Sequence, residues 1–157
     1  MEILGDYTPS LLRAFKEIDP NYNKYKALVI AGSHNPHHVE EYIQKIKQAR
    51  ISGLPFYGEC WGHQLAAIEY ARTILGIADA TSEEWGIGTY VVQRRRDLKV
   101  GLHDGESYWN NFEVVIEWEK PKNFFTAQFH ASYQSAIDKP HPLIKSFLDY
   151  AMAMQNK

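Results

Sequence analysis

Apolar residues in the first half of the chain form two kinds of pattern that alternate along the sequence. Short unbroken apolar runs predict buried strands at residues 2–4, 26–31 and 54–57. Apolar residues spaced three or four apart follow each run and predict helices over 8–18, from 35 to about 46, and from 61 toward 76. Three strand–helix pairs in succession predict parallel strands joined by right-handed crossovers.

The second half of the chain has a different pattern. Alternating and β-branched segments at 88–94, 112–118 and 124–129 follow one another without helices between them. We expect them to be antiparallel or mixed strands added to the edge of the same sheet, with a last helix over 142–154. No linker or repeat interrupts the pattern, which predicts one α/β domain over residues 1–157 with a central, mostly parallel sheet.

The loop after the second predicted strand contains local helix-start signals. Asn35 is a residue type that caps helices, and Pro36 suits the first helical position, so we expect the helix to begin there. His34, His37 and His38 lie close together in this loop. No cysteine or carboxylate at ligand spacing accompanies them, so a polar loop is favoured over a metal site.

Composition and charge exclude several classes of protein. A chain of 157 residues with 45% hydrophobic residues can bury about 70% of its unfolded surface without disulfides, and its one cysteine forms no internal bridge. The first residues lack a signal-peptide pattern and no apolar run is long enough for a membrane span, so we expect a cytoplasmic protein. A net charge of −2 gives no general attraction to nucleic acid.

Residues 55–64 contain the one cysteine, Cys60, between Gly58 and Gly62 at the predicted junction of a strand and a helix. This is the pattern of a nucleophile elbow, in which small neighbours permit a strained backbone at the nucleophile. The helix N-terminus is expected to lower the thiol pKa. The alternative interpretation is a small buried hydrophobe, the usual role of a lone cysteine.

A cysteine nucleophile needs a base and donors for the oxyanion. His130 follows the predicted strand 124–129, at a carboxyl end where ligands of parallel sheets bind, and is the first choice of base. A hydrogen-bonded structural histidine is the alternative. The backbone N–H groups of Gly32 or Ser33 and of Trp61 are expected to form the oxyanion hole.

The motif Gly58-Glu59-Cys60-Trp61-Gly62-His63-Gln64 matches the Gly-x-Cys-x-Gly-x-Gln signature of class I glutamine amidotransferases. The runs 66–72 and 127–130, with Glu113-Val114, look like the amidotransferase domain of CTP synthase. Still more similar is the small stand-alone family related to the CTP synthase C-terminal region, which residues 4–7 and 69–80 resemble. The resemblance covers nearly the whole chain.

The resemblance implies a flavodoxin-like three-layer sandwich and a Cys-His-Glu site that releases ammonia from glutamine through a thioester. Cys60 is then the nucleophile, His130 the base, and Gln64 a substrate-binding residue, with no cofactor. Members of the family act as hydrolases or transferases, often coupled to a synthetase partner that consumes the ammonia.

Three positions depart from the family pattern. Ser132 stands two residues after His130, where the family has the triad Glu, and is expected to hydrogen-bond the ring without balancing its charge. Asn111 stands where an arginine is thought to hold the glutamine α-carboxylate, and Gly32-Ser33 replaces Gly-Gly.

The position before the nucleophile is also unusual. Glu59 replaces a small or apolar residue and supplies a carboxylate that we hypothesise turns toward His130. Alternation along a strand argues against this, and a charge there would equally raise the thiol pKa.

These features predict Cys-His chemistry on a small-molecule amide such as glutamine, or on a bulkier and less anionic one. His34, Asn111 and Trp109 are the further substrate-binding candidates, with Trp61 and Trp85 as additional pocket walls and core packing as their alternative role. The rival hypothesis is a catalytically inactive relative that binds a small metabolite or a partner synthetase.

Overall fold

Four parallel strands form the central sheet of the computed structural model, which describes residues 1–157. Their order is β1-β2-β3-β9. The strands are β1 (Glu2–Leu4), β2 (Leu28–Ile30), β3 (Phe56–Glu59) and β9 (Phe124–Ala127). The helices are α1 (Pro9–Ile18), α2 (Val39–Ser52), α3 (Trp61–Thr73) and α4 (Pro142–Gln155), with 3-10 turns η1 (Tyr22–Lys24) and η2 (Ala131–Gln134).

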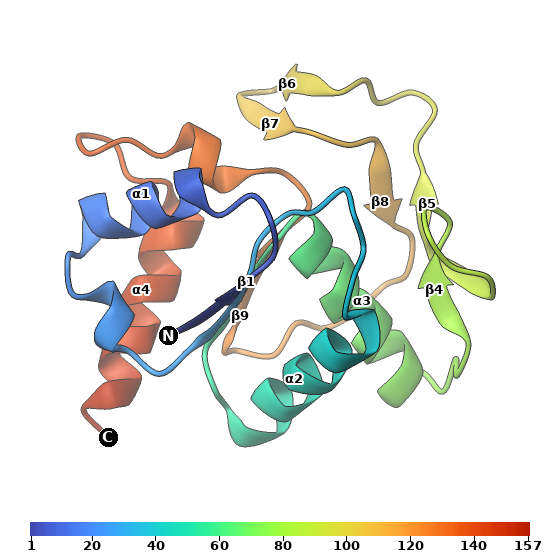
Figure 1. The fold of residues 1–157 in the computed structure, drawn as a ribbon, viewed down its shortest axis with the longest axis horizontal. Coiled ribbons are helices and arrows are strands. Elements are labelled where there is room, and N and C mark those ends of the chain that lie inside the picture. The colour runs from blue at the N-terminus through green and yellow to red at the C-terminus, as the bar shows by residue number, and fades with distance from the viewer.

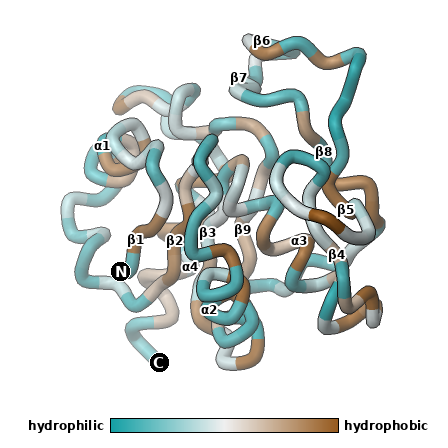
Figure 2. Tube along the Cα trace, turned by 45° about the vertical axis from the view of Figure 1, so that its right-hand side comes forward, coloured by the Kyte–Doolittle hydropathy of each residue, from teal (hydrophilic) through white to brown (hydrophobic).

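Helices cover both faces of this sheet, so the three-layer α/β sandwich is confirmed (Figure 1). One buried cluster joins α1 and α4 to the sheet, and the other joins α2 and α3 to its opposite face. Hydrophobic residues concentrate on the central strands, whereas α2 is hydrophobic on one side and hydrophilic on the other (Figure 2). The alternation of apolar runs in the first half of the chain therefore corresponds to the order of strands and helices.

The later strands do not extend this sheet as expected. Only β9 joins it, and it pairs in parallel with β3. A separate sheet contains β4 (Ala80–Ser82), β5 (Thr89–Arg94) and β8 (Phe112–Val114), and a hairpin contains β6 (Gly101–His103) and β7 (Glu106–Tyr108). The reason is that α3 has apolar residues on nearly every side. The face that does not pack on the central sheet is buried by β5 and β8, through Val91, Val92 and Phe112.

The start of α2 also differs from the expectation. The helix begins at Val39, after His38 in a left-handed conformation with φ 52°, so Asn35 does not cap it and Pro36 does not open it. Asn35 instead makes a local turn, in which its N–H donates to the Ser33 hydroxyl at 3.0 Å. None of the helices has the length and apolar character needed to cross a membrane.

Backbone segments pack very closely at the junction of β3 and α3. A Cβ on Gly62 would overlap the carbonyl oxygen of Ile30 in β2, and one on Gly58 would lie 2.9 Å from the Gly62 carbonyl. Both glycines are therefore required by close approach, since backbone atoms cannot move aside as the end of a long side chain can. This contact holds the first turn of α3 against β2.

We predict that Gly62→Ala destabilises the fold by about 3 kcal/mol or more, because the added methyl group meets the backbone of β2. Chemical denaturation followed by circular dichroism measures this. Gln44→Ala, on the exposed side of α2, is the control and is expected to change stability by less than about 0.5 kcal/mol. Equal stability of the two variants would contradict the packing described.

Candidate functional site

Cys60 is the residue at which β3 turns into α3. Its φ of 55° and ψ of −103° are a strained combination for a residue with a side chain, costing roughly 1–3 kcal/mol. Its N–H donates to the Ala127 carbonyl of β9 at 2.9 Å, which ties the turn to the neighbouring strand. The residue has the backbone geometry expected of a nucleophile elbow.

Polar groups surround the sulfur although the residue is only 1% exposed. The Asn110 Nδ2 donates to Sγ at 2.7 Å, and the Gln128 Nε2 lies 3.9 Å from it. Gln128 also donates to the Asn110 Oδ1 at 3.1 Å and accepts from the Gln64 Nε2 at 3.4 Å. The thiol thus lies at the end of an amide network rather than among apolar side chains.

The thiol pKa is not lowered as the elbow pattern led us to expect. Burial, together with the negative charges of Glu59 and Glu84, raises the pKa of Cys60 to about 12. The Trp61 N–H and the Asn110 amide act in the opposite direction but are outweighed. At neutral pH the resting sulfur is therefore a protonated thiol.

His130 follows β9 at the same edge of the sheet as Cys60, because β3 and β9 pair in parallel. Its backbone N–H donates to the Ser107 carbonyl at 2.8 Å, and its ring packs against Gly32. Neither ring nitrogen has a hydrogen-bond partner, although both are buried. The ring is therefore not a hydrogen-bonded structural histidine, and it is not hydrogen-bonded to the sulfur in this resting arrangement.

Burial, together with a smaller electrostatic effect of the nearby His34, lowers the pKa of His130 to about 4. The imidazole is consequently neutral at pH 7 and has a free nitrogen lone pair. A neutral imidazole beside a neutral thiol is the starting state for general-base activation, rather than a preformed ion pair.

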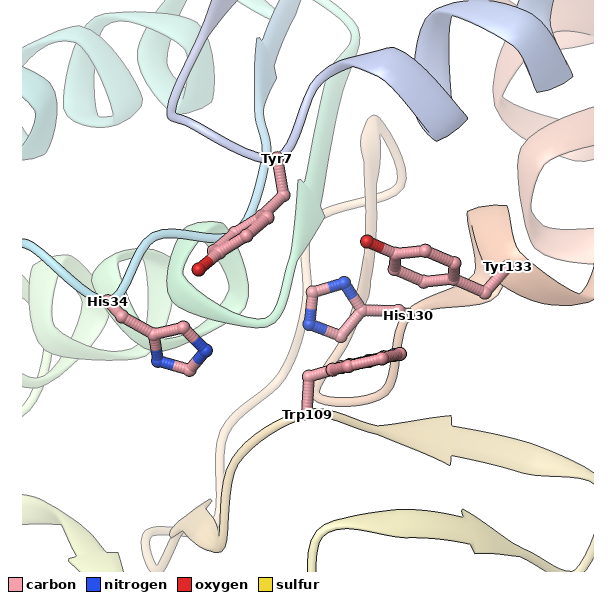
Figure 3. Close-up of a pocket in the computed structure, with 5 residues that line it drawn as sticks. All are labelled: Tyr7, His34, Trp109, His130 and Tyr133. Carbon is pink, nitrogen blue, oxygen red and sulfur yellow. The ribbon is translucent and has the colours of Figure 1, made fainter.

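A cavity of about 140 Å³ lies in front of His130 (Figure 3). Its other walls are Tyr7, His34, Trp109 and Tyr133, and the Trp109 and Tyr133 rings lie 5.2 Å apart. His130 is buried, whereas the four wall residues reach solvent, so the imidazole forms the inner end. The volume suits only a small ligand unless the walls move, since small-molecule pockets commonly have about 300 Å³ or more.

The predicted substrate-binding residues divide into two groups. His34 and Trp109 line the cavity, and Gln64 is buried beside Gln128. Asn111 lines no wall of this cavity, and its backbone carbonyl accepts from the backbone N–H of Arg95 at 2.6 Å.

Two of the three tryptophans proposed as pocket walls are not in the cavity. Trp61 is 1% exposed and lies against His37 and Tyr42, and Trp85 packs on the core cluster of α2 and α3. Among the loop histidines only His34 reaches the cavity, and no group of three or more His, Cys, Asp or Glu side chains gathers in a way that could hold a metal ion.

The backbone donors expected for an oxyanion hole lie around the same edge. The Gly32 carbonyl accepts from the N–H groups of Asp6 and Tyr7 at 3.0 and 3.1 Å, which fixes the loop. The N–H groups of Gly32 and Ser33 donate no backbone hydrogen bond elsewhere. The Trp61 N–H faces the sulfur.

Glu59 and Ser132 contact each other rather than His130. The Glu59 Oε1 accepts from the Ser132 N–H at 2.8 Å, and Oε2 accepts from its hydroxyl at 3.1 Å. The expected hydrogen bond of Ser132 to the imidazole is absent, and so is the hypothesised direct contact of Glu59 with it. Alternation along β3 is the reason, since it directs Glu59 toward η2.

Several residues around the site were not singled out from the sequence. Tyr7 and Tyr133 gave no local signal because they reach the cavity only through the tertiary fold. Asn110 and Gln128 lie beside recognised residues, at positions next to Asn111 and two before His130. Glu84, half-buried and close enough to raise the thiol pKa, had no signal of its own.

A family model described as "Glutamine amidotransferase class-I" matches residues 9–111, more than half of the chain. The chain belongs to this family. The matched region contains Cys60 and ends before His130 and Ser132.

Curated relatives of this amidotransferase-family chain include CTP synthases. It is 28% identical to the CTP synthase of Encephalitozoon cuniculi (strain GB-M1) over 178 residues, covering 79% of the chain and 33% of that protein. Identity to the CTP synthase of Methanoculleus marisnigri is 48% over 65 residues, covering 41% of the chain and 12% of the relative. The chain spans about a third or less of the curated relatives it matches.

A solved structure has the same fold. The Trypanosoma brucei CTPS glutaminase domain with bound acivicin superposes with a TM-score of 0.76 at 18% identity, covering 97% of this chain and 93% of that one. The family expected from the elbow motif is thus confirmed, together with its fold.

We predict that Asn110→Asp slows alkylation of Cys60 by iodoacetamide about tenfold at pH 8. The aspartate keeps the oxygen that accepts from Gln128, but it removes the donor to the sulfur and adds a like charge, which raises the thiol pKa. Intact-mass spectrometry measures the rate. Asn111→Asp adds the same charge at the next residue and is the control; equal slowing in both variants would show that the amide contact is unimportant.

The raised pKa of the Glu59 carboxyl makes the stability of the fold depend on pH in a predictable direction. Burial raises its pKa from 4.5 to about 7, so the folded state retains a proton that the unfolded state has lost. The stabilisation that comes from the raised Glu59 pKa is present below pH 4.5 and is lost as pH rises through 7. The lowered pKa of His130 has the opposite effect, because the stabilisation that it gives is lost as pH falls from 6.5 through 4.

We therefore predict that Glu59→Gln becomes more stable relative to the wild type as pH rises, by about 3 kcal/mol between pH 4.5 and 8.5. The difference isolates Glu59 because both proteins keep His130. Urea denaturation at several pH values measures it. Parallel stability curves for the two proteins would contradict a buried carboxyl with a raised pKa.

Proposed function

We propose that the chain is a glutaminase-type amidotransferase domain in which Cys60 attacks a small amide and His130 carries the protons. The observation that carries the proposal is the strained backbone of Cys60 with the Trp61 N–H facing its sulfur, beside a cavity that ends at His130. Membership of the family and the acivicin bound in the Trypanosoma brucei domain support glutamine as the amide.

The reaction begins when the His130 ring takes the thiol proton and Sγ bonds to the amide carbon. The N–H groups of Trp61 and of the Gly32–Ser33 loop then hydrogen-bond the carbonyl oxygen as it becomes negative. The imidazolium returns the proton to the departing nitrogen, the C–N bond breaks, and ammonia leaves a thioester on Cys60. Water, deprotonated by His130, cleaves the thioester to the carboxylic acid and restores the thiol.

This sequence requires movement of the resting site. The thiol is 1% exposed and the imidazole makes no hydrogen bond to it, so substrate entry must displace the covering side chains and rotate His130 toward the sulfur. No hydrogen bond of the ring has to break for that rotation, because neither ring nitrogen has a partner.

Measurement of ammonia release from glutamine tests the proposal, with acivicin as a covalent probe. We expect release by the wild type, an adduct on Cys60 by peptide mass spectrometry, and neither with Cys60→Ala. His130→Asn should lower turnover by about 100-fold or more. His103→Asn, on the β6–β7 hairpin, is the matched control and should retain turnover.

A second candidate function is supported by the resting chemistry. A buried, protonated thiol without a hydrogen bond to His130 suits an inactive relative that binds a small metabolite in the aromatic cavity. A wild type that releases no ammonia and forms no acivicin adduct, but whose tryptophan fluorescence changes on titration with glutamine while that of Trp109→Phe does not, would favour this function. Such a result would refute the enzymatic proposal.

A synthetase partner is a further part of the enzymatic proposal. The curated relatives are CTP synthases of which this chain matches about a third or less, and in this proposal a second active site on the partner consumes the ammonia. Co-purification of the tagged chain with a synthetase that raises ammonia release supports the coupling; unchanged turnover on adding that synthetase opposes it.

A further inference from the structure

Glu59 is a buried carboxylate with no cationic partner. The residue is 1% exposed, and its two oxygens are hydrogen-bonded by the N–H and the hydroxyl of Ser132. The Ser132 hydroxyl lies 3.2 Å from that of Ser10 at the start of α1. A carboxylate is costly to bury, and an apolar residue here would pack on the α1–α4 side of the sheet without that cost.

The contacts of Glu59 fix the turn that begins directly after His130. Ser132 is the second residue of η2, and Glu59 holds its N–H while Arg13 donates to its carbonyl at 3.0 Å and to that of Ser135 at 3.1 Å. The turn is thus held from two elements. His130 immediately precedes it, so the position of the imidazole depends on these contacts.

We propose that Glu59 is a positioning residue for His130, which holds η2 through Ser132 and supplies the negative charge that stabilises the imidazolium formed when Cys60 loses its proton. This inference rests on the proposed function, since it assigns the carboxylate of the same Cys-His site. In the family pattern that carboxylate follows the histidine at the position of Ser132. Here the carboxylate comes from β3 and contacts that position from the other side.

The charge state of the carboxyl supports this role. Burial raises the pKa of Glu59 to about 7 while that of His130 is lowered to about 4, so the carboxyl is ionised and the imidazole neutral just above neutral pH. The titratable groups that face Glu59 are Tyr57 and Cys60 on its own strand and elbow, and Arg13 of α1 approaches through Ser132. We therefore expect the contribution of the Glu59 charge to the reactivity to appear as pH rises through about 7.

The simplest rival role predicts the opposite sign. A charge next to the sulfur raises the thiol pKa, so a Glu59 that acted only on Cys60 would suppress thiolate formation. Removing that charge would then speed alkylation of Cys60. If Glu59 acts on His130, removing it slows the reaction, because the base loses its balancing charge.

Glu59→Gln separates these roles with little change in shape. A glutamine can accept from the Ser132 N–H and donate to its hydroxyl, so the contacts with η2 remain and only the charge is lost. The measurement is the rate of Cys60 alkylation by iodoacetamide from pH 6 to 9, which needs no substrate. Glu41→Gln, on the exposed side of α2, is the control for loss of one negative charge.

We expect Glu59→Gln to react about tenfold more slowly than the wild type at pH 8 and at a rate close to the wild type at pH 6, where the wild-type carboxyl is protonated, while Glu41→Gln follows the wild type throughout. Faster or unchanged alkylation would overturn the proposal. A wild-type thiol that stays unreactive across the whole range would overturn it as well, because no imidazolium then forms.

A relocation variant adds a second test. Glu59→Leu combined with Ser132→Glu moves the carboxylate to the other side of the contact, and it should recover most of the alkylation rate lost in Glu59→Leu alone. No recovery in a double variant with wild-type circular dichroism would contradict a role of the charge. Failure of the proposed function is recognised separately, since it abolishes ammonia release by the wild type whatever Glu59→Gln does to alkylation.

Discussion

The close approach of the first turn of α3 to β2 is the constraint on which the rest of the structure depends. Gly62 packs against the Ile30 carbonyl and Gly58 packs against Gly62, so there is no room for a side chain at either glycine where the strand turns into the helix. Cys60 lies between these two glycines with a positive φ, and this conformation directs the Trp61 N–H at its sulfur. Packing of backbone against backbone sets the chemistry of the elbow.

Burial then determines the charges at this edge of the sheet. It raises the pKa values of Cys60 and Glu59 and lowers that of His130, so the resting thiol and imidazole are both neutral. The effect of the helix N-terminus on the thiol pKa is too small to reverse that of burial. A site of this kind is activated by substrate entry rather than by a standing ion pair.

Local pattern located the helices and most of the strands, but it did not predict β4, β6 or β7, nor how the strands assemble into sheets. Apolar runs and helical spacing located the first three strand–helix pairs because each pattern reflects its own buried face. The separate β4-β5-β8 sheet was missed because it covers a face of α3 that the central sheet and α2 leave open. The sequence pattern does not show that α3 is buried on nearly every side. The start of α2 was missed because His38 adopts a left-handed conformation, which cannot be predicted from a histidine at this position.

The same division applies to the site. Cys60 is marked by its two glycines, and His130 by its place after a strand, whereas Tyr7 and Tyr133 come from opposite ends of the chain. The thiol pKa could not be predicted because burial of the sulfur, which raises it, is a tertiary effect.

The most direct test of Cys60 as a nucleophile served by His130 is a crystal structure after incubation with acivicin. The account predicts electron density continuous from Sγ into the compound, with a His130 nitrogen now within hydrogen-bond distance of the sulfur or of the attached group. An unmodified thiol still hydrogen-bonded to Asn110, with His130 against Gly32 and no compound in the cavity, would contradict it.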